Sequence, residues 1–374
     1  MNILDKYLSD SKLNFSSKSI IHIVIGNEAA DIDSIASSIV YAFFKESINI
    51  EKEEIFIPVI NIPEDDLRLR NEAIYLFSQA EINPQNLIFN DQIDLKDLAE
   101  KQKLKLILVD HNKISYKQEF LSDYIEEVID HHSDEKTYND VVKRIEKIGS
   151  TATLVGEKIV NNGLFLLDKA SATILSGAIL LDTSNLSYRS GKTMEKDIKI
   201  LNYLISEYKI NRTELFKNLS TEKRNISNLS SCDILRKDYK EWIMGRKKTG
   251  FSSVSLSLKA WLKKDPSLLE EISKYYIKNS LDILFIMIAY ADTEFKRELI
   301  LFGKDPSLLD NIYFYLQKSG GRLFPIEGIT KGETDKEKNT SMNGVARFYF
   351  LGETLWSRKR LQPILKTFFT SHNY

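Results

Sequence analysis

The first half of the chain alternates short apolar runs with segments in which apolar residues recur at helical spacing. The runs IIHIVIG (20–26), EIFIPVINI (54–62) and KLKLILVD (103–110) have the length and the β-branched content of buried strands. The segment SIASSIVYAFFKE (34–46), between the first two runs, instead repeats apolar residues every three or four positions. This order predicts an α/β domain in which helices cover both faces of a parallel sheet.

The same alternation continues through the rest of this half. NLIF (86–89) and YIEEVID (124–130) have the pattern of further strands, and TATLVGEKIVNNG (151–163) and SATILSGAILLD (171–182) have the pattern of helices. We therefore expect the first domain to span residues 1–195.

A second, smaller α/β domain with its own core is expected over residues 225–374. The segment before it, 196–224, is polar and charged and has no strong strand pattern, which predicts a linker. Beyond the linker, four runs have the pattern of strands and one has the pattern of a helix. The strand runs are FSSVSLSL (251–258), LDILFIMIAYA (281–291), RELILFG (297–303) and GVARFYFLG (344–352), and the helix run is PSLLEEISKYYIKN (266–279).

Charge, cysteine content and the length of the apolar runs narrow the class of protein. The 374 residues include 52 basic and 53 acidic side chains, so the composition does not require nucleic-acid binding. The single cysteine, Cys232, rules out an intrachain disulfide and fits a reducing compartment. The longest apolar run, ILFIMIAYA (283–291), is far shorter than the roughly 20 residues that cross a bilayer. We therefore expect a soluble, monomeric, cytoplasmic protein with no nucleic acid and no membrane as a partner.

Carboxylates stand where the predicted strands of the first domain end. Asp31 and Asp33 come after the first strand, and Asp110 and Asp130 close two later ones. The carboxyl ends of parallel strands share one edge of the sheet, so we expect these side chains to lie together. Burying them without a positive partner would be costly, and a metal ion is the candidate partner. Taken singly, each aspartate is also an ordinary cap for the start of a helix.

A fuller set of donors is expected at the same edge. Asp31, Asp33, Asp110 and Asp182 offer carboxylate oxygens, and His131 offers an imidazole. This mixture of hard oxygen ligands and one nitrogen suits Mg²⁺ or Mn²⁺. Two such ions, roughly 3.5 to 4 Å apart, can activate a water molecule and neutralise phosphoryl oxygens.

Four motifs, in this order, resemble those of the DHH phosphoesterase superfamily. They are NEAADID (27–33), LVDHN (108–112), VIDHH (128–132) and GSTATL (149–154). The resemblance implies a parallel-sheet DHH domain that carries the metal site.

Motifs in the second half narrow the resemblance to members with a C-terminal DHHA2 domain. They are FSSVSLSL (251–258), DYKEW (238–242) and SRKRLQP (357–363). That group contains cytosolic exopolyphosphatases, family II inorganic pyrophosphatases and prune-type proteins, and the stretch 26–43 looks closest to the yeast-type exopolyphosphatases. The resemblance implies a smaller α/β DHHA2 domain with a mixed sheet that binds substrate.

The resemblance also implies which side chains hold which ion. Asp31 would serve one metal, whereas Asp33, His131 and Asp182 would serve the other. Asp110 would bridge the two ions.

Substrate contacts are implied on both domains. By resemblance His132 contacts a substrate phosphate, and Lys240, Arg358 and Lys359 match the phosphate-binding positions of the DHHA2 domain. His132 and Arg358, together with the bridging Asp110, are the expected catalytic residues.

Three assignments have plain structural alternatives. His111 either orients substrate, and is then counted among the substrate-binding residues, or is a structural histidine. Ser150, in GST (149–151), is either an N-cap or a phosphate contact. Without the resemblance, the cationic run SRKR (357–360) is an ordinary solvated surface.

Together these features predict a metal-dependent exopolyphosphatase, which is a phosphoric anhydride hydrolase. Water held by two ions, Mg²⁺ or Mn²⁺, would attack the terminal phosphorus of inorganic polyphosphate or of other short phosphate anhydrides and release orthophosphate. Asn27 stands where the pyrophosphatases carry a metal-binding histidine, so we expect it to tune the metal preference.

The alternatives are a family II-like pyrophosphatase and a prune-like phosphodiesterase or protein-binding scaffold. Asn27 points away from the pyrophosphatases, and the presence of His132 points away from prune-type proteins that lack the second histidine of the motif. A nuclease is disfavoured because Arg322 stands where that branch of the superfamily requires the histidine of a GGGH motif.

Overall fold

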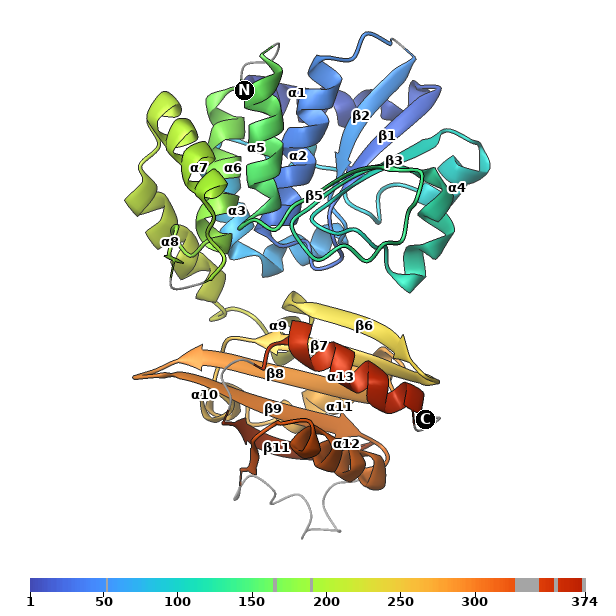
Figure 1. The fold of residues 1–374 in the computed structure, drawn as a ribbon, viewed down its shortest axis with the longest axis vertical. Helices are drawn as coiled ribbons and strands as arrows, with labels where there is room; N and C mark the ends of the chain where they lie inside the picture. Colours follow the sequence, from blue (N-terminus) through green and yellow to red (C-terminus); the bar gives the residue numbers. More distant parts are fainter. Residues whose placement is uncertain (52, 164–166, 189–190, 327–342, 353–355, 372–374) are drawn as a thin grey trace. The chain divides into compact units, whose positions relative to one another are not determined.

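The chain consists of two units, Met1–Asn225 and Ile226–Tyr374, each built around its own sheet. The computed structural model describes residues 1–374 except 52, 164–166, 189–190, 327–342, 353–355 and 372–374 (Figure 1). Among the described helices, none has both the length and the hydropathy that a membrane span requires.

The first unit contains a five-stranded parallel sheet with the strand order β2-β1-β3-β4-β5. Its strands are β1 (Ile20–Ile25), β2 (Glu54–Val59), β3 (Leu104–Val109), β4 (Ile125–Asp130) and β5 (Val142–Ile145). The chain runs from β1 to β2 on one side and then returns to β3 on the other side of β1. Open α/β sheets bind their ligands at the carboxyl edge next to such a reversal.

Helices cover both faces of this sheet, as the sequence predicts (Figure 1). Alternate strand residues point to opposite sides, so that Val24 packs against the larger core cluster and Ile23 against the smaller one. Helices α2, α3 and α5 to α8 contribute to the larger cluster, and α4 contributes to the smaller one. The helices are α1 (Ile3–Asn14), α2 (Ile32–Ser47), α3 (Asn71–Gln79), α4 (Leu95–Glu100), α5 (Thr151–Asn162), α6 (Lys169–Asp182), α7 (Glu195–Tyr208) and α8 (Arg212–Arg224).

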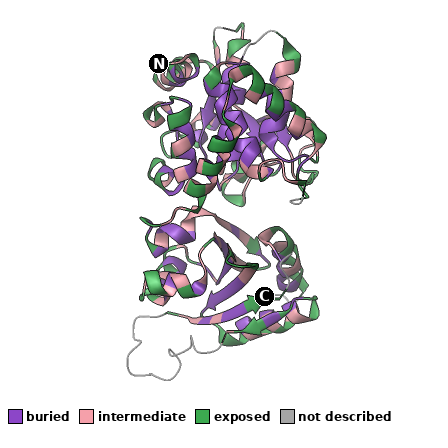
Figure 2. Ribbon diagram, turned by 90° about the vertical axis from the view of Figure 1, so that its left-hand side faces the viewer, coloured by how far each residue is buried: buried purple, intermediate pink, exposed green. Residues whose placement is uncertain are grey.

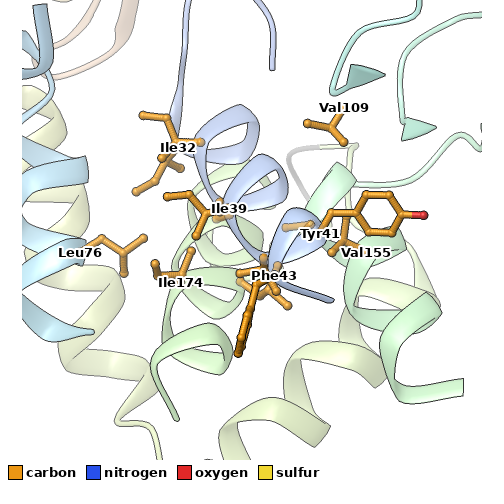
Figure 3. Packing of buried hydrophobic residues seen from close by; sticks show 14 of the residues in the cluster. Ile32, Ile39, Tyr41, Phe43, Leu76, Val109, Val155 and Ile174 are labelled. Carbon is orange, nitrogen blue, oxygen red and sulfur yellow. The ribbon is translucent and has the colours of Figure 1, made fainter. Parts of the chain in front are cut away.

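Helix α2 is the centre of the larger cluster. Thirteen consecutive residues, from Ile32 to Phe44, are buried. Figure 3 shows Ile39 of α2 near Leu76 of α3 and Ile174 of α6, and all three side chains belong to the same cluster. Because a close-packed helix cannot shift without opening cavities, the first turn of α2 is held firmly in place.

The second unit contains a six-stranded mixed sheet with the order β10-β11-β9-β8-β7-β6. Strands β7 and β8 pair in parallel, and the other neighbours pair antiparallel. The strands are β6 (Tyr239–Met244), β7 (Lys247–Val254), β8 (Ile283–Ala291), β9 (Phe295–Gly303), β10 (Leu323–Pro325) and β11 (Val345–Leu351).

Helices also pack on both faces of the second sheet, whose central strands β7, β8 and β9 are largely buried (Figure 2). Helices α12 and α13 share a core cluster with one face. On the opposite face, Tyr276 of α11 meets the ring of Phe302 on β9. The helices of this unit are α9 (Ser231–Lys237), α10 (Leu258–Lys264), α11 (Leu268–Lys278), α12 (Pro306–Lys318) and α13 (Arg358–Ser371).

The structure corrects two sequence predictions. Residues 196–224, predicted as a linker, form most of α7 and all of α8, and Leu204 and Leu219 are buried in the core of the first unit. The charged outer faces of these amphipathic helices conceal their apolar stripes. The predicted strand 86–89 is reduced to an isolated parallel bridge between Ile60 and Phe89.

Candidate metal centre

The loop after β1 is shaped by close packing and by a buried arginine. A Cβ atom at Gly26 would lie 2.6 Å from the Cβ of Ser34, so only glycine lets the loop approach α2 this closely. The Arg70 guanidinium is buried and donates hydrogen bonds to the carbonyl oxygens of Ala29 and Ala30. These contacts help to hold Ala30 at its positive φ of 42°. The chain therefore has one defined path from β1 into α2.

Asp31 and Asp33 lie at the start of α2 and have different partners. Asp31 is the N-cap, and its carboxylate accepts the backbone N–H of Ser34 over 3.1 Å. Asp33 is fully buried and accepts the backbone N–H groups of Thr151 and Ala152 over 2.7 and 2.8 Å. A carboxylate from α2 thus occupies the start of α5 and joins the two helices at the carboxyl edge of the sheet.

Ser150 is the N-cap of α5. Its oxygen accepts the backbone N–H of Ala152 over 3.2 Å, and its hydroxyl donates to Asp33 over 2.7 Å. The N–H groups at this helix start therefore face Asp33. The structure supports the capping role for Ser150 over the phosphate contact.

Asp110 follows β3, with its backbone in the left-handed region at φ 61° and only 2% of its surface exposed. Its Oδ2 accepts hydrogen bonds from Asn27 Nδ2 over 2.8 Å and from Ser34 Oγ over 2.7 Å. Its Oδ1 lies 3.4 Å from His131 Nε2 and 3.7 Å from His132 Nδ1. One carboxylate oxygen is therefore held by neutral donors, while the other faces the two imidazoles.

The two histidines after β4 are oriented through their Nδ1 atoms. His131 Nδ1 lies 3.0 Å from the carbonyl oxygen of Ile148, so it carries a hydrogen and directs Nε2 toward the carboxylates. His132 Nδ1 lies 2.8 Å from the fully buried Asp130, which also accepts both histidine backbone N–H groups and the Asn112 amide. Burial alone would raise the pKa of Asp130, but the bonds from His132 and Asn112 outweigh burial and lower it.

Two groups of donors meet at this edge and share His131. One group is Asp110, His131 and His132, and the other is Asp33, His131 and Asp182. In each group, one ligand atom of every residue lies within 4.8 Å of the others. Asp182 is the last residue of α6, so the second group joins two helices to the end of β4.

Burial and mutual repulsion raise the pKa of three of these carboxylates. The pKa of Asp33, Asp110 and Asp182 rises from 3.8 to about 7, first through burial and then through nearby negative charges, including that of Asp31. Burial alone would lower the pKa of His131, but the hydrogen bond to Asp110 and the charge of Asp33 raise it to about 10. Oxygen-rich sites with excess negative charge are the kind that Mg²⁺ and Mn²⁺ bind. The donor set therefore fits a metal centre.

Three predicted residues of the first unit lie outside the two donor groups, among the described residues. Asp31 contributes its charge at the start of α2. Asn27 is buried and contacts Asp110 through its amide nitrogen, and its amide oxygen accepts the backbone N–H of Ala29 over 2.8 Å. His111 Nδ1 lies 2.9 Å from the carbonyl oxygen of its second neighbour along the chain, Val109.

The predicted cations Lys240, Arg358 and Lys359 belong to the second unit. Arg358 begins α13, and its Nη2 lies 2.8 Å from Asp238 Oδ1 while its Nη1 donates to the Asp238 carbonyl oxygen over 3.2 Å. Asp238 immediately precedes β6, in which Lys240 lies. Arg358 and Lys240 are thus brought to the same end of β6, and Lys359 is exposed on the first turn of α13.

Several residues that support the site had no role in the sequence prediction. Asn112 stands within the motif LVDHN and Ser34 directly follows NEAADID, so their amide and hydroxyl groups were visible as candidate partners for buried carboxylates. Arg70 gave no comparable signal, because it lies in a charged segment far from the motifs in sequence. Its role follows from tertiary packing alone.

Comparison with known proteins covers both units. Residues 22–183 match the DHH family, N-terminal domain, and residues 217–368 match the DHHA2 domain. The chain is 32% identical to exopolyphosphatase PRUNE1 of Rattus norvegicus, over 97% of this chain and 78% of the relative. It is 35% identical to a protein of Schizosaccharomyces pombe named "Putative exopolyphosphatase", over 75% of this chain and 76% of the relative.

A solved structure shares the fold. It is the crystal structure of a Methanococcus jannaschii protein named "putative family II inorganic pyrophosphatase". It aligns with a TM-score of 0.62 at 20% identity, over 92% of this chain and 98% of that chain. The fold of this chain is therefore one that a solved structure also has.

Proposed function

Since the chain belongs to the DHH family and carries a DHHA2 domain, we propose that it is a metal-dependent exopolyphosphatase. It would release terminal orthophosphate from inorganic polyphosphate or from other short phosphate anhydrides. The observation that carries the proposal is the pair of donor groups that share His131 at the carboxyl edge of the parallel sheet. Two relatives that are named exopolyphosphatases, at 32% and 35% identity, support this choice of substrate.

The metal assignment is part of the proposal. Asp33, His131 and Asp182 would hold one ion, Asp31 would hold the other, and Asp110 would lie between them. Bound Mg²⁺ or Mn²⁺ supplies Lewis-acid charge and lowers the pKa of a coordinated water. The hydrogen bonds that His131 Nδ1 donates to the Ile148 carbonyl oxygen, and that the Ser34 hydroxyl donates to Asp110, keep these ligands in one orientation.

His132 is proposed to bind a phosphate oxygen of the substrate. Its Nδ1 is engaged with Asp130, which fixes the plane of the imidazole ring. Its Nε2 has no partner among the residues that the structure describes, so it can donate to a phosphate oxygen when the ring is protonated. The buried Asp130 carboxylate is itself held by four donors, so it keeps the ring in one orientation.

The cations of the second unit are proposed to bind the remaining phosphates. Arg358 and Lys240 lie at the same end of β6, and the pairing of Arg358 with Asp238 fixes the direction of the guanidinium. A planar guanidinium can bind two phosphate oxygens at once. Lys359 would add a further positive charge, and His111 would orient the substrate from the first unit.

Particular residues argue against each of the two alternative functions. A pyrophosphatase of family II would carry histidine at position 27, where this chain has Asn27. A scaffold that has lost catalysis would not need the two donor groups that share His131. Exopolyphosphatase activity is therefore the function that the site supports best.

A substrate series tests the proposal. Phosphate release is measured with pyrophosphate, tripolyphosphate and long-chain polyphosphate, in Mg²⁺, in Mn²⁺ and in a chelator. We expect the highest kcat/KM with tripolyphosphate or long polyphosphate, and no turnover in the chelator. A preference for pyrophosphate would contradict the proposal and favour the pyrophosphatase alternative. Inactivity on all three substrates with both metals would favour a protein-binding scaffold without catalytic activity.

A further inference from the structure

A pocket of about 370 Å³ lies in the first unit between the end of α6 and the last turns of α8. Its lining combines two cationic side chains, two hydroxyl groups and two apolar side chains. The residues that line it are Leu181, Ser184, Phe216, Ser220, Lys223 and Arg224. Nothing in the proposed chemistry uses these residues.

The pocket is next to the metal centre. Leu181 directly precedes Asp182 in the chain, and Ser184 follows it by two positions. Asp182 belongs to the second donor group, so two residues that line the pocket flank a carboxylate of the metal centre.

Several polar groups of the pocket lack protein partners. Arg224 donates through Nε to the Ser220 carbonyl oxygen over 2.9 Å. Within the described ranges, its two Nη atoms have no hydrogen-bond partner, and neither do the hydroxyl groups of Ser184 and Ser220. A guanidinium with open Nη donors beside two hydroxyl groups matches the tetrahedral, multiply charged oxygens of a phosphate.

The wall that carries Ser184 is held in an unusual conformation. Ser184, Asn185 and Leu186 all have positive φ, at 51°, 61° and 60°. The Arg212 guanidinium clamps this turn through Nε to Asn185 Oδ1 and through Nη2 to the Asn185 carbonyl oxygen, both over 2.7 Å. Backbone conformations of this kind persist only where the surrounding structure enforces them. The side of the pocket next to Asp182 is therefore rigid.

We infer that this pocket is a subsite for the third phosphate of the substrate, beyond the two phosphates that flank the cleaved anhydride bond, and that Arg224, Lys223 and the two serine hydroxyls bind it. The inference rests on the proposed function. Pyrophosphate has no such third phosphate, so the subsite favours chains of three or more phosphates. The subsite therefore acts as a chain-length determinant within the first unit.

Equilibrium binding tests the subsite without turnover. The probes are methylene-bridged triphosphonate and diphosphonate, which have three and two phosphorus centres and cannot be hydrolysed at the bridge, measured by calorimetry in Mg²⁺. We expect Arg224→Gln to raise the Kd of the triphosphonate about tenfold, which is the size of a lost charge-assisted hydrogen bond, and to leave the diphosphonate within twofold. Lys217→Gln is the matched control, because it removes the same charge from an exposed position of α8 two turns away.

The outcomes separate the inference from the proposed function. An unchanged triphosphonate Kd in Arg224→Gln and in the double variant Lys223→Gln/Arg224→Gln overturns the subsite. An equal loss for both probes, or an equal loss in Lys217→Gln, also overturns it, since the effect would then be one of overall charge. A purely structural role of Arg224 at the helix end would lower Tm without changing either Kd. Failure of the proposed function is read separately, as absence of phosphate release from polyphosphate by the unmodified chain.

Discussion

The side-chain amide of Asn27 donates a hydrogen bond to Asp110 Oδ2 over 2.8 Å. The oxygen of the same amide accepts the backbone N–H of Ala29, so the nitrogen faces the carboxylates. In the proposed metal centre this hydrogen bond would withdraw electron density from Asp110, the proposed bridging ligand. The side chain at position 27 is therefore in direct contact with the group on which both ions would depend.

Asn27→His tests this contact. An imidazole at this position can bind a metal directly, and nitrogen donors favour Mn²⁺ and Co²⁺ over Mg²⁺. We expect the Kd for Mn²⁺ or Co²⁺ to fall by about tenfold and the relative activity to shift toward pyrophosphate. Metal titrations and parallel assays on pyrophosphate and long polyphosphate measure the two effects. Asn27→Ala, which removes the amide without adding a ligand, is the control. If Asn27→His binds Mg²⁺, Mn²⁺ and Co²⁺ with the same order of Kd values as the unmodified chain, the tuning role is refuted.

Asp110→Asn is expected to abolish phosphate release. A neutral amide cannot replace a bridging carboxylate, and the expected loss in kcat exceeds roughly 10²-fold. The fold should survive, because asparagine tolerates the positive φ of 61° at this position and is nearly isosteric. Circular dichroism and Tm in a chelator confirm folding. A folded variant with near wild-type turnover would show that Asp110 holds no ion.

The metal-free protein should lose stability as pH rises. The pKa of Asp33, Asp110 and Asp182 is raised from 3.8 to about 7 in the folded chain, so protonation favours folding. This contribution is complete below the unfolded-state pKa near 4 and is lost as pH rises through 7. We expect Tm in a chelator to fall from pH 6 to pH 8, and saturating Mg²⁺ or Mn²⁺ to remove the fall, because the cation replaces the protons.

Thermal melts at pH 6, 7 and 8 measure this dependence, and Asp182→Asn is the matched control. The variant has one ionisable carboxylate fewer in the second donor group. Its Tm in the chelator should therefore fall less steeply from pH 6 to pH 8. A Tm in the chelator that rises over the same range would contradict the assigned pKa shifts.

The edge of the sheet that carries the site could be predicted, whereas the contacts that organise it could not. Asp31 and Asp110 follow strongly apolar runs, and strands of this kind end at a common edge in any parallel sheet. The capping of α5 by Asp33 joins residues 118 positions apart, and such a pairing leaves no mark in local periodicity. The same holds for the salt link between Arg358 and Asp238, which are 120 positions apart.

Two of the elements that the sequence did not predict have weak apolar contrast. In α7, the spacing of Ile200, Leu201 and Leu204 is helical, but charged residues between them made the segment resemble a linker. Strand β5 is exposed or half-buried along its length and carries two cations in four residues, so it lacks the apolar signature of its neighbours. Edge strands and surface helices are held mainly by tertiary contacts that a single sequence does not display.

Arg358→Ala distinguishes a substrate contact from a structural ion pair. Removing a cation that binds a transferring phosphate chain can cost roughly 10² to 10³ in rate. Asp238→Ala removes the same ion pair but leaves the cation. We expect kcat/KM on polyphosphate to fall by about 10²-fold in Arg358→Ala and by less than tenfold in Asp238→Ala. If Arg358→Ala and Asp238→Ala lose the same activity and the same Tm as each other, the role of Arg358 is purely structural.

The central claim is that divalent ions bind between Asp33, Asp110, His131 and Asp182 at the carboxyl edge of the first sheet. A crystal structure of the full chain grown with Mn²⁺, with anomalous scattering measured at the manganese edge, tests it most directly. We predict two anomalous peaks roughly 3.5 to 4 Å apart within reach of these side chains, with Asp110 contacting both. Saturating Mn²⁺ with no anomalous peak at this edge would contradict the account.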